Sequence, residues 1–271
     1  MLAGHPEELS RGSAVKQSVR ILLDSLIDYA GLFPPASLPL DQAIRKYDEY
    51  RNSEYSWALG RFVVAASQMR DVPADFPLSV LASSADAIPD SYVVEVKAKN
   101  AEEIDLIKQQ AARQVIYIEV ADVDLIEIIG HYGFRAKIRT GGVTAEAFPS
   151  VDQVATFIRT ARQKNVPFKA TAGLHHPIRC AKPFTYESNS PAGTMHGFIN
   201  VFLAAALPGS ATQILREENS RAFGFDDGGV WYRDLRVTNE ELDRVRKKNA
   251  ISFGSCSFEE PINDLEELGW L

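Results

Sequence analysis

Four segments of the chain alternate between apolar and polar or charged side chains at every second position. They span residues 93–97, 116–120, 135–139 and 168–171. Because successive side chains of a β-strand point to opposite faces of a sheet, each segment predicts a strand with one apolar and one charged face. The charged face carries, among others, Glu95, Lys97, Glu119, Lys137, Arg139 and Lys169.

The segments between these strands have the pattern of helices, which makes the strands parallel and their sheet buried. In an open sheet covered by helices on both faces, strands are typically unbroken apolar runs, whereas a closed barrel can hold charged side chains in its lumen. Candidate strands span residues 61–67, 78–83, 92–98, 114–120, 134–140, 167–173, 222–237 and 250–257. We therefore predict an α/β fold, a (β/α)8 TIM-like barrel.

Two units of this pattern are weak. Residues 84–91 are too few for a regular helix. The seventh candidate strand, 222–237, is divided by the turn signal Asp-Asp-Gly-Gly at 226–229, so this segment is alternatively a hairpin outside the barrel.

An N-terminal helical extension is predicted over residues 14–60. Residues 14–28 have the spacing of an amphipathic helix, and a second helix is expected over residues 40–51. Between them, the apolar segment 29–36 contains adjacent prolines, so it is neither helix nor central strand. We predict a plug across the bottom of the barrel, with a lid over its mouth as the alternative.

The composition narrows the class of protein. With 271 residues, 45% of them hydrophobic, the chain is long enough for one domain, predicted over 14–271 after a loose polar tail over 1–13. That tail has no apolar secretory signal, and the two cysteines have no metal-type spacing, so a reduced, cytoplasmic protein is expected. The charge of −7, without a basic block, argues against nucleic-acid and membrane partners. Whether the chain forms a homo-oligomer stays open.

The balance of charges on the predicted strands points to a ligand. Four basic residues, Lys97, Lys137, Arg139 and Lys169, face two glutamates. A positive lumen in an acidic protein predicts a small organic anion as substrate, since a cleft focuses the field of its charges. Active sites of such barrels lie at the C-terminal ends of the strands.

Lys137 and Lys169 are expected on neighbouring strands, at similar heights and on the same face. Two ammonium groups close together disfavour each other's charged form, and burial adds to this effect, so one of them is predicted to be neutral near pH 7. A neutral lysine is a nucleophile that can form a Schiff base with a carbonyl compound. The alternative is that the lysines and glutamates form a structural ionic network.

Other residues at the strand ends would complete such a site. Arg139 is predicted to hold a carboxylate or phosphate, with the backbone amides of residues 140–142 as an anion-binding nest. Glu119 or Tyr117 would move protons, and His175, after the sixth predicted strand, is a candidate for acid–base work. The residues predicted to bind substrate are Arg139, Lys97, Glu95, Thr140, Gly141, Gly142, Thr171 and His176.

The segments 136–142 (AKIRTGG) and 168–173 (FKATAG) resemble the lysine-dependent, Schiff-base (class I) aldolases built on (β/α)8 barrels. In these enzymes two lysines on neighbouring strands include the Schiff-base residue. The resemblance implies a lyase in which Lys137 or Lys169 forms the imine, in an order it leaves open; Lys169 is our first choice. No phosphate-cradling glycine run follows the last two strands, which favours a small oxo-acid as substrate over a sugar phosphate.

Two other functions remain open from the sequence. A metal-dependent hydrolase or isomerase would use His175, His176 and His196 with Glu119, although we predict no metal or other cofactor. A non-catalytic barrel that binds a small anion would share the predicted binding residues. Cys256 is predicted to be a small core residue, because no activating histidine lies near it in the sequence.

Overall fold

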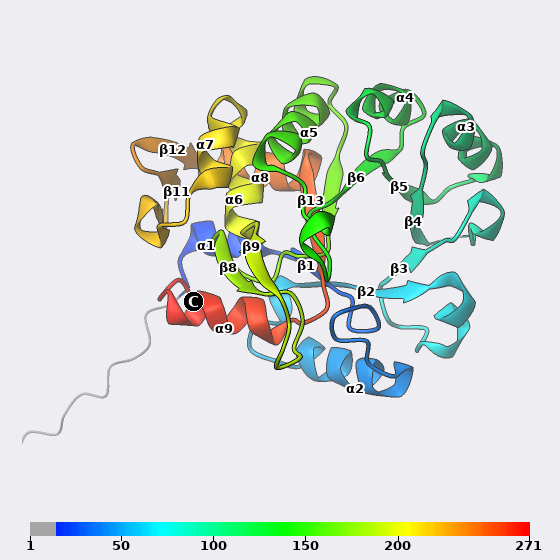
Figure 1. Cartoon of the computed structure of the whole chain (residues 1–271), viewed down its shortest axis with the longest axis horizontal. Coiled ribbons are helices and arrows are strands. Elements are labelled where there is room, and N and C mark those ends of the chain that lie inside the picture. The colour runs from blue at the N-terminus through cyan, green and yellow to red at the C-terminus, as the bar shows by residue number, and fades with distance from the viewer. Residues whose placement is uncertain (1–14, 91) are drawn as a thin grey trace, which may run out of the picture.

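The computed structural model describes residues 15–90 and 92–271, and its centre is a closed barrel of eight parallel strands (Figure 1). The barrel strands are β1 (Ile27–Tyr29), β2 (Leu59–Ala65), β3 (Leu78–Leu81), β4 (Val93–Lys97), β5 (Val115–Glu119), β6 (Arg135–Arg139), β7 (Phe168–Thr171) and β13 (Ala250–Ser255). They follow one another around the barrel in chain order, and β13 pairs with β1 to close it. The predicted TIM-like barrel is confirmed.

Helices alternate with most of the barrel strands. They are α1 (Gln17–Leu23), α2 (Leu40–Arg51), α3 (Ala101–Gln110), α4 (Ile126–His131), α5 (Val151–Gln163), α6 (Phe198–Ala206), α7 (Ala211–Arg216), α8 (Asn239–Lys248) and α9 (Glu259–Glu267). The side chain of Asn100 caps α3, and Ser150 and Thr238 form reciprocal capping boxes at α5 and α8. The weak second unit has only one helical turn, η3 (Ala85–Ala87).

One predicted barrel strand is wrong and one barrel strand was missed, so the total of eight strands is still correct. The first barrel strand is β1, which the sequence pattern assigns to the end of a helix, because three residues are too few to display alternation. Segment 222–237 instead forms an antiparallel sheet outside the barrel, made of β10 (Phe223–Asp226), β11 (Gly229–Tyr232) and β12 (Leu235–Thr238). The Asp226 carboxylate accepts the N–H groups of Gly228 and Gly229, which holds the turn between β10 and β11.

The proline-containing loop over residues 29–36 lies at the mouth of the barrel, so its prediction as a bottom plug is wrong. It follows the C-terminal end of β1, and all barrel strands are parallel, so it emerges at the end where the other strands also finish. Its residues Ala30, Phe33 and Pro34 line a cavity together with Cys256, which directly follows β13. A second mouth element is the hairpin of β8 (Cys180–Pro183) and β9 (Ala192–Met195).

The alternation of the sequence separates the lumen from the helix layer. The side chains of Glu95, Lys137 and Lys169 point into the lumen, where at most 3% of each residue is exposed. The apolar side chains between them are buried in the hydrophobic core and are Val94, Val96, Ile116, Ile118, Ala136, Ile138, Phe168 and Ala170. The predicted charged face is therefore the lumen.

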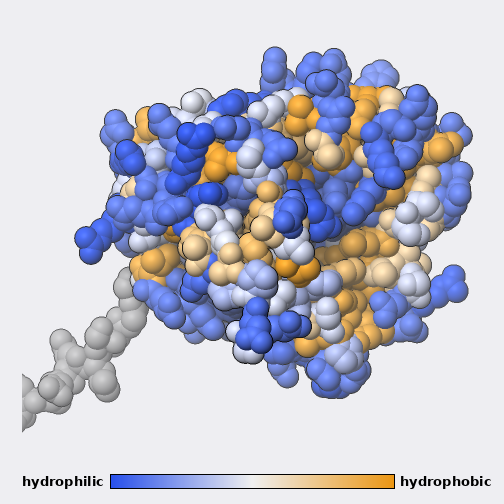
Figure 2. All heavy atoms as spheres, in the orientation of Figure 1, coloured by the Kyte–Doolittle hydropathy of each residue, from blue (hydrophilic) through white to orange (hydrophobic). Residues whose placement is uncertain are grey.

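The outer surface shown in Figure 2 is largely hydrophilic, with hydrophobic residues gathered in the lower part of the view, in the region of α2 and β2. Within residues 15–90 and 92–271, no helix has both the length and the apolar character needed to cross a membrane. The tail predicted over residues 1–13 lies outside the described residues.

Strands β1 and β2 approach each other most closely at Gly60, where any side chain would collide with β1. Asp28 accepts the N–H of Arg61 at 2.7 Å. A Cβ atom on Gly60 would stand 2.4 Å from the Asp28 carboxylate and 3.2 Å from the carbonyl oxygen of Ile27. The close approach of the two strands thus depends on the missing side chain at residue 60.

We expect Gly60→Ala to lower the free energy of unfolding by about 1–3 kcal/mol, because the new methyl group displaces the buried Asp28 carboxylate. Gly209→Ala is the control: a Cβ there meets nothing within 4 Å, so its effect should stay within about 0.5 kcal/mol. Denaturant unfolding of both variants measures the difference, and equal effects would contradict the role of Gly60.

Candidate active site

A continuous chain of ion pairs runs along the barrel lumen. Lys169 Nζ lies 2.6 Å from Asp28 Oδ2 and 2.5 Å from Glu95 Oε1. The second oxygen of Glu95 is 2.8 Å from Lys137 Nζ, which in turn lies 2.9 Å from Glu119 Oε2. The five side chains alternate in charge, so each buried ion faces an opposite one.

The predicted placement of the two lysines is confirmed, but their expected electrostatics is not. Lys137 and Lys169 are partners in register on β6 and β7. However, Glu95 binds one ammonium group with each of its oxygens and separates their charges. Burial disfavours the charged form of Lys169, but the carboxylates of Asp28 and Glu95 outweigh it and raise the lysine pKa. The expectation that Lys137 makes Lys169 neutral is therefore wrong.

Glu95 is held as a carboxylate at the centre of this chain. Burial raises its pKa, but the neighbouring Lys137 and Lys169 outweigh burial and lower it well below the usual range. Ser79 also donates a hydrogen bond of 2.6 Å to Glu95 Oε1. At the lower end of the chain, Ser252 donates to Asp28 Oδ2 at 2.7 Å. The predicted substrate-binding residue Glu95 is thus part of the ionic network.

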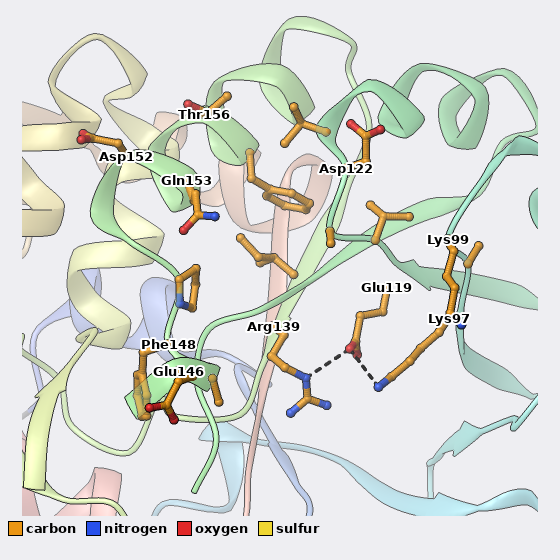
Figure 3. A pocket seen from close by; sticks show the side chains of 18 residues that line it. Lys97, Lys99, Glu119, Asp122, Arg139, Glu146, Phe148, Asp152, Gln153 and Thr156 are labelled. Carbon is orange, nitrogen blue, oxygen red and sulfur yellow. Dashed lines mark hydrogen bonds and ion pairs between the residues drawn. The ribbon is translucent and has the colours of Figure 1, made fainter. Parts of the chain in front are cut away.

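At the C-terminal ends of the strands, the row of ion pairs reaches the barrel rim through Glu119, which lies between Arg139 and Lys97 (Figure 3). Glu119 Oε1 lies 3.2 Å from Arg139 Nε and 3.4 Å from Lys97 Nζ. Burial raises the pKa of Glu119, but Lys137, helped by Arg139 and Lys97, lowers it overall. The side chains of Arg139 and Lys97 are 44% and 69% exposed, so these two cations are open to solvent.

The buried part of the network does not carry the expected positive excess. The charges counted from the sequence did not include Asp28. With it, the lumen holds three carboxylates and only two ammonium groups, those of Lys137 and Lys169. The surplus of positive charge lies at the rim, on Arg139 and Lys97. An anion would therefore meet favourable charge at the mouth and not deep in the barrel.

Lys137 and Lys169 border different cavities at the two ends of the barrel. A mouth cavity of about 250 Å³ is lined by Lys137, Arg139, His175, Cys256 and the loop after β1. A cavity of about 340 Å³ at the N-terminal strand ends is lined by Lys169, with Asp28 and Tyr117. Since active sites of these barrels lie at the C-terminal ends, the mouth cavity is the candidate active site.

A larger outer cavity of about 850 Å³ lies between the ends of β5 and β6 and the start of α5 (Figure 3). Lys97, Glu119 and Arg139 border one side of it, and Asp152 and Gln153 of α5 border the other. Arg139 lines both the outer cavity and the mouth cavity. The predicted binding residue Lys97 thus belongs to the outer cavity.

His175 is the centre of a polar cluster at the mouth. Its Nδ1 atom lies 3.2 Å from Glu260 Oε2 and 3.9 Å from Cys256 Sγ. The hydroxyl group of Tyr186, in the β8–β9 hairpin, is 3.2 Å from the same Glu260 oxygen and 3.5 Å from the sulfur. Burial lowers the pKa of His175, but Cys256 and Glu260 outweigh it and raise that pKa to about 10.

Sequence reasoning missed three members of these clusters. Asp28 lies within a predicted helix, Glu260 is one of many acidic residues near the C-terminus, and Tyr186 belongs to a long loop. The sequence signals that marked the mouth were the paired histidines after β7 and the Arg139–Gly142 segment after β6. Cys256, predicted to be a core residue, is buried as expected but lines the mouth cavity beside His175.

The other two predicted site histidines are His176, whose Nε2 lies 3.9 Å from Glu260 Oε1, and His196. His176 Nδ1 lies 2.6 Å from Asp264 Oδ2 on α9. His196 Nε2 is 2.8 Å from the carbonyl oxygen of Pro149, and burial lowers the pKa of His196. Among the residues that the structure describes, no three His, Cys, Asp or Glu side chains are grouped so as to hold a metal ion. The geometry therefore gives no support to the metal-dependent alternative.

The predicted anion nest is only partly at the mouth cavity. Of the nest residues, Gly142 lines the cavity, and Thr171, predicted separately to bind substrate, lines it as well. The buried Thr140 hydroxyl instead donates a hydrogen bond of 2.7 Å to the carbonyl oxygen of Ala172. A Cβ on Gly141 would stand 2.8 Å from the Cα of Gly173, so this glycine allows the loops after β6 and β7 to pack together.

No protein-family model matches this chain, and a search of curated proteins also finds no match.

We expect Lys169→Met to lower the free energy of unfolding by about 3–5 kcal/mol, because it leaves Asp28 and Glu95 buried without their shared cation. Adding Asp28→Asn should restore part of this loss. Lys164→Met is a matched control, since Lys164 pairs with Glu127 at 2.7 Å on the surface, and its effect should stay below about 1 kcal/mol. A mild effect of Lys169→Met in denaturant unfolding would contradict the proposed network.

The raised pKa of His175 predicts a specific pH dependence of stability. A group whose pKa is higher in the folded than in the unfolded state stabilises the fold fully below its unfolded pKa, and this contribution disappears as the pH rises through the folded value. The stability difference between the protein and His175→Gln should therefore shrink between about pH 6.5 and about pH 10. Denaturant unfolding across this range tests it. The neighbouring Cys256, Glu260 and Tyr186 are present in both proteins, and a pH-independent difference would contradict the assignment.

Proposed function

We propose that this protein is an enzyme that acts on a small anionic carbonyl compound, such as an oxo-acid, by a lyase or aldolase-type reaction at the barrel mouth. Lys137 is the proposed nucleophile. The observation that carries this choice is that Lys137 lines the mouth cavity beside Arg139, whereas Lys169 borders the cavity at the opposite end. This changes our first choice from Lys169 to its register partner.

Arg139 is the proposed group that holds the substrate anion. Its guanidinium is only partly engaged by Glu119, at 3.2 Å from Nε, and its side chain is 44% exposed. A guanidinium can present two parallel N–H donors to a carboxylate, which orients the ligand as well as attracting it. The carbonyl carbon next to that carboxylate would then lie in the cavity that Lys137 borders.

Imine formation requires that Lys137 first loses a proton. Glu119, 2.9 Å away, is the carboxylate positioned to accept it. The free amine then adds to the carbonyl carbon, and the resulting carbinolamine loses its hydroxyl group as water. His175 is the proposed acid for that step, because its pKa of about 10 keeps it protonated near neutral pH. The imine formed would accept the electron pair released when a neighbouring carbon–carbon bond breaks.

Lys169 has a supporting part in this proposal. Its ammonium group holds Glu95 Oε1 at 2.5 Å, which leaves the other oxygen directed at Lys137. Lys169 would thus position the nucleophile through Glu95 without touching substrate. A non-catalytic barrel that binds an anion would use the same Arg139 site, and only turnover separates it from the enzyme.

Borohydride trapping followed by peptide mass mapping tests the nucleophile. With a panel of 2-oxo acids and neutral aldehydes, we expect a reduced adduct on Lys137 that is absent from Lys137→Met. Arg139→Ala should lose most trapping of the oxo-acids and keep trapping of the neutral aldehydes, because it removes only the carboxylate contact. If the folded protein gives no lysine adduct with any carbonyl compound, the lyase proposal fails. Adducts that form only on surface lysines would also contradict the lyase proposal.

A further inference from the structure

The side chain of Cys256 is well placed to meet a ligand in the mouth cavity. The residue follows the last barrel strand directly, so it lies at the C-terminal end where the cavity opens. Only 6% of it is exposed to bulk solvent, yet it lines the mouth cavity together with Lys137 and Arg139. An anion held by Arg139 would therefore lie in the cavity that the sulfur borders.

The sulfur lies next to an imidazole that is itself paired with a carboxylate. His175 Nδ1 is 3.9 Å from Cys256 Sγ, and Glu260 Oε2 approaches the same nitrogen at 3.2 Å. A carboxylate next to an imidazole stabilises the imidazolium ion, and an imidazolium next to a cysteine stabilises the thiolate. Tyr186 adds a hydroxyl group at 3.5 Å from the sulfur, which can donate a hydrogen bond to a thiolate.

The other cysteine of the chain has the opposite surroundings. Cys180, at the start of β8, is more exposed than Cys256. Burial raises the pKa of its thiol to about 11, the nearby Lys182 opposes this, and Asp264, Glu218 and Glu260 raise it further. Cys180 is therefore an internal reference: a reagent limited only by access would prefer it, whereas one limited by thiolate formation would prefer Cys256.

We infer that Cys256 and His175 form a nucleophilic thiol site that adds reversibly to small anionic aldehydes or 2-oxo acids bound in the mouth cavity. Starting from the pair of Cys256 thiolate and His175 imidazolium, the sulfur forms a bond to the carbonyl carbon, and the π electrons of the C=O bond move to its oxygen. That oxygen then takes the proton from His175, which leaves a thiohemiacetal. The addition needs no further reactant and no imine at Lys137, so it is independent of the lysine chemistry proposed above.

Alkylation of the full chain near pH 7, with peptide mapping, tests the thiol. Iodoacetamide should modify Cys256 about tenfold faster than Cys180, although Cys180 is more exposed. His175→Gln should slow the modification of Cys256 about tenfold and leave the rate at Cys180 unchanged, which also reports that the fold is intact. A slower rate at Cys256 than at Cys180, or no effect of His175→Gln, would overturn the inference.

Protection experiments test the carbonyl addition. Glyoxylate should protect Cys256 from iodoacetamide, reversibly on dialysis, and glycolate, an anion of similar size without a carbonyl group, should not. The protection should persist in Lys137→Met, which cannot form an imine there. Equal protection by both anions, or none, would overturn the addition. If Cys256 is alkylated and protected as expected but no borohydride adduct forms, only the lysine proposal fails. If Lys137 gives an adduct but Cys256 is unreactive, only the present inference fails.

Discussion

The buried chain of ions from Asp28 to Glu119 is the constraint on which the rest of the structure depends. Each ion would destabilise the fold by several kcal/mol if it were buried alone, so the fold must supply an opposite charge for each. A shift of one residue in the register of β6 would turn Lys137 from the lumen to the helix layer. The ion pairs between β1, β4, β5, β6 and β7 therefore require both the observed register and the closure of the barrel.

The same row of ion pairs is fully buried in the lower part of the barrel and partly exposed to solvent at its rim. Lys169 is enclosed between two carboxylates and is 1% exposed, so its charge serves the fold. Towards the rim, the pairing becomes looser: Glu119 is shared between Lys137 and the partly exposed Arg139 and Lys97. Charged groups that are paired yet open to solvent exchange partners with a ligand more readily than fully buried pairs do.

The mouth brings together segments that are far apart in the chain. His175 follows β7, Cys256 follows β13, Glu260 belongs to α9, and Tyr186 comes from the β8–β9 hairpin. Parallel strands make this possible, because all of their C-terminal ends meet on one side of the barrel. The mouth therefore brings an amine, a thiol and a guanidinium group to the lining of one small cavity.

The sequence by itself determined the barrel and its charged lumen, because alternation along a strand is a local property that Glu95, Lys137 and Lys169 display directly. It also placed the two lysines on neighbouring strands, at similar heights and on the same face, and the structure pairs them in register. Only the tertiary structure decided which opposite charges they meet. Asp28 comes from a strand too short to show a pattern, and it lies 141 positions before Lys169 in the chain. The pairing of Cys256 with His175, 81 positions apart, likewise depends on barrel closure, which no local pattern encodes.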